Sequence, residues 1–121
     1  PPPKTNKKPL ALTITVATNS IQVTTGVPAV TRKRIGKTAD GEYDLTSLHD
    51  FLIKLKKNHL KEEGAILEPI ADLTYEEIVK IMDAIRKMKN TDEPIFIKDK
   101  DGTDMQLKTL FSKIMFGNIM S

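Results

Sequence analysis

The sequence of 121 residues contains no cysteine and no tryptophan, and aromatic residues make up only 5% of it. Without cysteine the chain has no thiol nucleophile, no thiolate metal ligand and no disulfide. No apolar run approaches the roughly 18 residues of a transmembrane helix, and nothing resembles a cleavable signal peptide. The net charge of +3 comes from 19 basic and 16 acidic residues that are interleaved. The long-range field is therefore weak, and nucleic acid is not an expected partner.

Hydrophobic residues (39%) and charged residues (29%) are present in the proportions of an ordinary globular protein. A chain of this length is expected to form one domain and to bury roughly two-thirds of its unfolded surface. The sequence begins PPPKTNKKP, and proline-rich segments favour extended conformations. We therefore expect residues 1–9 to be a tether that continues from a segment further upstream, and residues 10–121 to be the folded domain.

Hydrophobic alternation predicts a β-hairpin at the start of the domain. Residues 10–17 alternate between large apolar side chains and smaller or polar ones, as in a half-buried strand. Residues 19–20 (Asn-Ser) are typical of a turn, and residues 21–26 predict a returning strand. The pattern is poor across residues 27–43, which contain a proline, two glycines and a basic cluster. This segment is predicted to be a long basic loop or insertion, with a short extended ribbon near residue 30 as the alternative.

The next elements carry clear helix start signals. Asp44 can cap a helix that ends before Gly64, and residues 65–71 predict a short strand. Thr74 and Glu77 have the spacing of a capping box, so a second helix is predicted to start there. The apolar side chains expected to face inward from this helix are those of Tyr75, Ile78, Val79, Met82, Ile85 and Met88.

Residues 95–97 predict a further strand and DKDGTD (residues 99–104) a turn, since the spacing of its acids does not fit a calcium-binding loop. A final helix capped near Thr103 is predicted to turn five apolar side chains inward, those of Leu107, Leu110, Phe111, Ile114 and Met115. The fold class is then α+β: a two-layer sandwich in which a small mixed β-sheet has helices packed on one face, in the order β-β-α-β-α-β-α.

Residues 10–98 resemble the periplasmic domain of the ExbD/TolR family of biopolymer transport proteins. The resemblance rests on the predicted hairpin, on the helix over residues 45–55 and above all on residues 66–88, with Ala71-Asp72, Tyr75, Ile78-Val79 and Met82-Asp83. It implies a protein of the cell inner membrane with one membrane-spanning helix, which would precede the tether, and with this domain in the periplasm.

Family members couple the proton motive force to work at the cell envelope. The resemblance therefore implies a homodimer that works with an ExbB/TolQ/MotA-like proton-channel subunit, drives a TonB- or TolA-like protein, and binds peptidoglycan in some members. No catalytic residue, cofactor or metal is implied, and the protein is not expected to be an enzyme.

Several residues are candidates for contacts with partners. The candidates for contact with a partner or peptidoglycan are Arg32, Lys33, Arg34, Lys37, Asp72 and Tyr75. The candidates for dimer contact are Phe116, Ile119 and Met120, because they extend beyond one inward stripe of the predicted final helix. For Asp72, the interpretation that we favour is structural, since a carboxylate before a helix is stabilised by the helix dipole by about 0.3–1 kcal/mol.

Two other functions stay open. The first is an independent binding module that recognises an anionic polymer through the basic segment and through Lys54, Lys57 and Lys61. The second and more remote is a hydrolase that uses Asp72 with Tyr75 or His49. A metal site is not indicated by the two histidines, His49 and His59, because no third ligand accompanies them.

Overall fold

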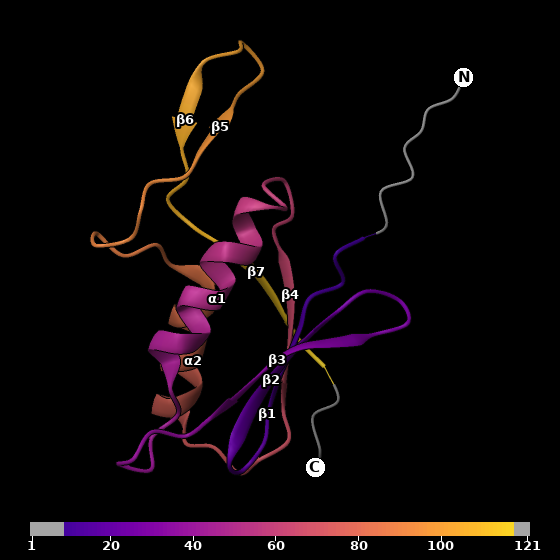
Figure 1. Ribbon diagram of the computed structural model, residues 1–121, viewed down its shortest axis with the longest axis vertical. Coiled ribbons are helices and arrows are strands. Elements are labelled where there is room, and N and C mark those ends of the chain that lie inside the picture. The colour runs from indigo at the N-terminus through magenta and orange to yellow at the C-terminus, as the bar shows by residue number, and fades with distance from the viewer. Residues whose placement is uncertain (1–8, 118–121) are drawn as a thin grey trace.

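The computed structural model describes residues 9–117 and is shown in Figure 1. Its elements in chain order are β1 (Thr13–Val16), β2 (Ser20–Thr25), β3 (Val30–Gly36), α1 (Leu45–Lys57), β4 (Gly64–Pro69), α2 (Tyr75–Arg86), β5 (Phe96–Lys98), β6 (Asp104–Gln106) and β7 (Lys113–Phe116). The predicted α+β class with a mixed sheet is confirmed, although the order of the elements differs from the predicted one.

Five strands form the main sheet in the order β3-β2-β1-β4-β7. The pairs β1–β2 and β2–β3 are antiparallel, whereas β1–β4 and β4–β7 are parallel. Along β1 and β2, alternate side chains are buried against the helices, and those between them are half-buried on the other face. The predicted hairpin of residues 10–26 is therefore confirmed, and it supplies two central strands of the sheet.

Both helices lie on one side of the main sheet, which gives the predicted two layers (Figure 1). The side chain of Asp44 accepts a hydrogen bond from the backbone N–H of Ser47 and so caps α1 as predicted. At the start of α2, the Glu77 N–H donates to the Thr74 hydroxyl (3.1 Å) and the Thr74 N–H donates to the Glu77 carboxylate (2.9 Å). This capping box was also predicted, and it sets where the chain turns from β4 into the second helix.

The prediction of a long loop over residues 27–43 is wrong for its central part, which forms β3, and the alternative of an extended ribbon near residue 30 is the one observed. This strand pairs with β2 along its whole length, with an irregularity between Val23 and Thr24. Only Ile35 of its seven residues is buried. The sequence of this strand therefore lacks the alternation of apolar and polar residues by which a half-buried strand is recognised. Gly26, at a φ of +90°, begins the tight turn that joins β2 to β3.

The predicted final helix is also wrong. The turn that begins at Asp99 joins β5 and β6 in a two-stranded hairpin. The backbone N–H of Asp99 donates to the Thr103 carbonyl across this turn, so Thr103 is part of the hairpin and does not cap a helix. The chain then runs irregularly, buries Leu110 and Phe111 completely, and enters β7. A turn at residues 99–104 was predicted correctly, and so was the burial of those two side chains.

Candidate functional site

Three of the predicted basic contacts lie on β3, at one edge of the main sheet. Arg32, Lys33 and Arg34 are all exposed, and Lys37 follows directly after the strand ends at Gly36. Because β3 is the outermost strand and pairs only with β2, its other side has no partner strand within residues 9–117. The backbone N–H and C=O groups on such an edge are available to another extended chain.

The cations of this edge have few partners inside the protein. Arg32 donates from Nε to the hydroxyl of Thr25 (2.8 Å), and the Lys37 ammonium lies 4.5 Å from the centre of the Tyr43 ring. In the described part of the chain, none of the four basic residues forms an ion pair with a carboxylate. Ion pairs with carboxylates are formed instead by Lys57, Arg86, Lys87, Lys98 and Lys113.

A groove of about 400 Å³ separates the edge strand from the first helix. One wall is the end of β3, Lys33–Gly36, and the other is a set of α1 side chains that begins at the capping residue. The α1 wall consists of Asp44, Ser47, Asp50, Phe51 and Lys54. Positions 47, 50, 51 and 54 fall at helical spacing, so they form one stripe along α1. We refer to this feature as the β3–α1 groove.

The groove contains charges of both signs and one aromatic ring. The Asp44 carboxylate is occupied by Ser47, whose backbone N–H (3.0 Å) and hydroxyl (2.7 Å) both donate to it. These hydrogen bonds, the one from the backbone first, hold the pKa of the Asp44 carboxyl below its ordinary value. Lys33 and Lys54 are exposed and make no ion pair with a described carboxylate, while Phe51 is half-buried and packs against the core.

Asp72 and Tyr75 lie at the turn between β4 and α2, away from any enclosed site. Both are exposed, and 81% of the Tyr75 surface is accessible to solvent, which corrects the prediction that Tyr75 faces inward. Within residues 9–117 the Asp72 carboxylate makes no side-chain hydrogen bond or ion pair. The side chains of α2 that are fully buried are those of Ile81 and Ile85.

The opposite edge of the sheet is β7, which pairs only with β4 in the described chain. Two of its four residues are exposed apolar side chains, Met115 (62% exposed) and Phe116 (44%). Phe116 was predicted as a dimer contact and is available for one. Ile119 and Met120, the other two residues predicted for that contact, lie outside the described residues.

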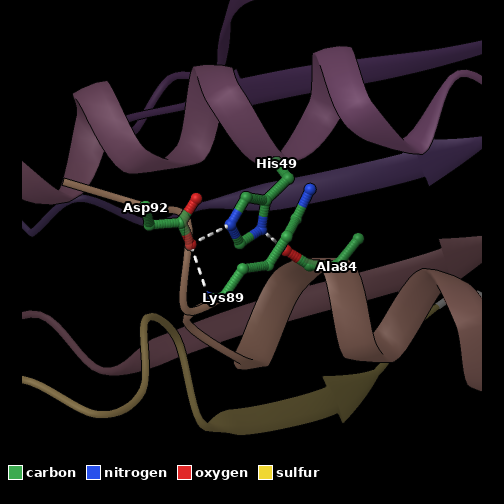
Figure 2. Close-up of polar contacts among 4 residues, drawn as sticks. All are labelled: His49, Ala84, Lys89 and Asp92. Atoms are coloured by element: carbon green, nitrogen blue, oxygen red, sulfur yellow. Dashed lines mark hydrogen bonds and ion pairs between the residues drawn. The ribbon is translucent and has the colours of Figure 1, made fainter.

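One enclosed polar cluster, centred on His49, was not indicated by the sequence (Figure 2). The ring of His49 is 1% exposed and lies between α1 and α2. Its Nδ1 is 2.8 Å from the carbonyl oxygen of Ala84, and its Nε2 is 2.7 Å from Oδ2 of Asp92. The same Asp92 oxygen accepts a hydrogen bond from the backbone N–H of Lys89 (2.6 Å).

The acceptors around His49 set the direction of its hydrogen bonds. A carbonyl oxygen can only accept, so Nδ1 must donate to Ala84. Burial alone raises the pKa of Asp92, but the hydrogen bonds from His49 and from the Lys89 backbone, with the nearby positive charges, outweigh burial and lower that pKa overall. Asp92 is thus ionised at neutral pH and accepts hydrogen bonds from His49 and from the Lys89 backbone. The cluster ties α1 to α2 and to the turn that follows.

The residues of the remote hydrolase hypothesis are not brought together. His49 bonds to Ala84, nine residues along α2 from Tyr75, which is about 13 Å along the helix axis. Both of its ring nitrogens are already occupied, so His49 is not free to act as a base for Asp72 or Tyr75. Within residues 9–117, no cluster of three or more His, Asp or Glu side chains is arranged to hold a metal ion.

The three lysines of the predicted basic helix face also separate. Lys54 lines the β3–α1 groove, whereas Lys57 is paired with Glu93. Lys61 lies beyond the end of α1 and is exposed. Of the three, Lys54 lies beside the cations of β3, whereas Lys57 and Lys61 do not line the groove with them.

None of the helices among residues 9–117 has the length and apolar character needed to span a bilayer. Comparison of the chain with protein-family models, with curated proteins and with solved structures gave no match.

Proposed function

We propose that this chain is the periplasmic domain of an ExbD/TolR-like subunit of the inner membrane, which receives motion from a proton-driven complex and passes it to envelope partners. In this proposal the domain is not an enzyme and carries no protons itself. The proton-carrying aspartate would lie in a membrane-spanning helix upstream of Pro1, and residues 1–9 would be the tether between that helix and the domain.

The observation that carries the proposal is the unit formed by residues 64–86. β4, the exposed turn at Asp72 and the capped helix α2 are continuous, and β4 pairs in parallel with β1 in the middle of the sheet. The same residues carry the sequence resemblance to the family. An acid at an exposed turn, with both adjoining elements held in the core, suits contact with a partner better than chemistry on a substrate.

In this proposal, the energy that drives the domain is released in the membrane and must be transmitted to it. Each elementary charge that crosses the membrane provides about 2.3 kcal/mol per 100 mV. This energy would have to reach the domain as tension or as a change in pairing, since the proton path ends in the membrane. Within residues 9–117 the two outer strands of the main sheet, β3 and β7, each pair on one side only, which gives the domain two surfaces at which pairing with a partner or with a second copy can change.

A second candidate function is an independent module that binds an anionic polymer. It is favoured by the cations of β3 and Lys37, which lack carboxylate partners in the described chain. Unlike the first proposal, it requires neither a membrane helix nor a second protein.

The decisive test is made on the full-length protein. The family proposal expects one span of about 20 apolar residues with a single aspartate before Pro1, and co-purification of the full-length protein with a proton-channel subunit from detergent-solubilised membranes. Replacement of that aspartate by asparagine should abolish the coupled activity and leave the complex assembled. A full-length protein without such a span would end the family proposal and leave the binding module.

A further inference from the structure

We propose that the β3–α1 groove binds an extended, acidic peptide segment of a protein partner, which adds to the sheet as a strand beside β3. The inference goes beyond the proposed function and does not rest on it. It depends only on the edge strand, the groove and the charges that line them.

The backbone of β3 supplies the first part of the recognition. Every second residue of an edge strand directs its N–H and C=O away from the neighbouring strand. On β3 those groups have no partner strand in the described chain, and the strand is seven residues long. An extended peptide can satisfy them with ladder hydrogen bonds, whereas a polysaccharide or a lipid headgroup has no matching repeat of donors and acceptors.

The groove has the length of a short strand. Lys33–Gly36 spans about 10 Å in an extended conformation, and the α1 stripe from Ser47 to Lys54 rises about 10 Å along the helix. The two walls therefore run alongside each other for about four peptide residues. A peptide strand placed here would have β3 on one side and α1 above alternate side chains.

The lining determines which peptide fits. Lys33, Arg34 and Lys54 border the groove without a described carboxylate partner, and Arg32 and Lys37 flank it. These five cations outnumber the two acids, of which Asp44 is already bonded to Ser47. Acidic side chains are thus favoured on the incoming strand, and Phe51 offers an apolar surface for one aliphatic side chain.

The same charges disfavour a second copy of the chain as the occupant. Pairing of β3 with another β3 would set Arg32, Lys33 and Arg34 opposite the same residues of the second copy, and like charges opposite one another on paired strands are destabilising. Charged side chains on an edge strand commonly prevent such self-association. An acidic strand removes this repulsion.

The test uses the complete chain, labelled with ¹⁵N, and blocked eight-residue peptides in which valine alternates with glutamate. Binding is followed by amide chemical shifts and by hydrogen exchange. We expect shifts confined to β3 and to the α1 stripe Ser47–Lys54, with slower exchange at alternate β3 amides. A peptide in which lysine replaces glutamate should not bind.

Two N-methylated peptides separate strand addition from charge attraction. One carries methyl groups on its odd amides and the other on its even amides, so their charges are equal. Only one set of amides can face β3, so one peptide should bind like the parent and the other should lose binding. Equal binding of both would overturn the proposal, because attraction by charge alone does not distinguish them.

Variants test the groove itself. The double substitution Lys33→Ser with Lys54→Ser should weaken binding about fivefold or more, while the matched control Lys80→Ser with Lys100→Ser, which removes two exposed lysines elsewhere, should not. Absence of binding at millimolar peptide would refute the proposal. Two other findings would also refute the proposal. Binding of purified cell wall through the same two lysines, without any peptide binding, would identify a cell-wall polymer as the ligand. Chemical-shift changes in β3 that depend on protein concentration alone would identify a second copy of the chain.

Discussion

Nε2 of His49 lies 2.7 Å from Oδ2 of Asp92, and this contact links the first helix to the turn that follows the second (Figure 2). The two residues are 43 positions apart in the sequence. His49 is buried, and the Asp92 side chain is 9% exposed, so the pair is largely shielded from water. Removal of either side chain leaves the other in the interior without its hydrogen-bond partner.

Replacement of His49 by alanine is therefore expected to lower the free energy of unfolding by about 3 kcal/mol, the lower end of the cost of breaking a buried ion pair. Asp92→Asn should cost less, because the amide oxygen can still accept from Lys89. Urea unfolding followed by circular dichroism measures both. Asp50→Asn, which changes an exposed carboxylate on the same helix, is the control and should stay within about 0.5 kcal/mol. A His49→Ala protein as stable as the parent would mean that the pair contributes nothing net.

The lowered pKa of Asp92 predicts acid sensitivity. A carboxyl with a lower pKa in the folded than in the unfolded protein contributes stability above the unfolded value, about 3.9, and that contribution is lost as pH falls through the folded value. Unfolding free energy should thus fall below about pH 4 more steeply in the parent than in Asp92→Asn. Parallel curves for the two proteins between pH 5 and pH 2 would contradict this assignment.

Lys56 predicts a dependence of the same sign at alkaline pH, where stability again rises with pH. Its side chain is buried, donates to the Glu62 carbonyl and lies 5.0 Å from the Phe111 ring centre. Burial lowers the pKa of the Lys56 ammonium, and the charges of Glu63 and Glu62 oppose that only in part. As pH rises through the folded value towards about 10.4, the unfolded chain holds the proton that the folded protein has released, so stability rises.

Lys56→Met should remove this rise while changing the unfolding free energy at pH 7 by no more than about 1 kcal/mol, because relief from the buried charge offsets the lost hydrogen bond. Chemical denaturation at pH 7 and pH 9.5 gives the comparison. Lys61→Met, at an exposed neighbouring position, should keep the parent's pH dependence. If both variants behave like the parent, the amine is better solvated than its burial indicates.

The capping box at α2 predicts which polar residue fixes the turn after β4. Thr74→Ala removes the hydroxyl that accepts from Glu77 and should lower stability by about 1 kcal/mol. Asp72→Ala should change it by less than about 0.5 kcal/mol, since Asp72 is exposed. Thermal unfolding of the two variants side by side is sufficient. A larger loss for Asp72 would support the structural role that the sequence suggested for it.

The β7 edge predicts self-association through Met115 and Phe116. At tens of micromolar, sedimentation equilibrium should give a mass above that of the 13.5 kDa monomer. Met115→Lys places a charge on this edge and should shift the equilibrium towards monomer. Ile70→Lys, also at an exposed apolar position, is the matched control and should not. A parent protein that sediments as a clean monomer would exclude this interface.

Local signals predicted the elements whose faces differ in environment. The β1–β2 hairpin, α1 with its Asp44 cap, and the β4–α2 unit each have one buried and one solvent-facing side, so their sequences show a period of two or of 3.6. β3 was predicted only as an alternative, because an edge strand exposed on both faces has no such period. Its β-branched Val30 and Thr31 and the preceding glycine turn were the available signals.

The C-terminal segment shows how a true core pattern can indicate the wrong element. Leu107, Leu110 and Phe111 have helical spacing and do pack into the core, but an irregular segment carries them. The end of this segment forms a strand and not a helix because β7 pairs with the side of β4 that β1 leaves open. The contact between His49 and Asp92 was beyond sequence reasoning, because no periodic pattern joins a helix to a turn 43 residues later.

The parallel pairing of β1 with β4 also governs how the chain reaches its fold. Thr15 and Glu68 are neighbours across this pair although 53 residues separate them, whereas β1, β2 and β3 follow one another through short turns. Loop closure over such a distance costs more chain entropy than a turn, and domains with many non-local contacts fold slowly. The three-stranded meander can therefore form first and leave the apolar edge of β1 unpaired until α1 and β4 arrive. During that interval, aggregation between nascent chains competes with folding.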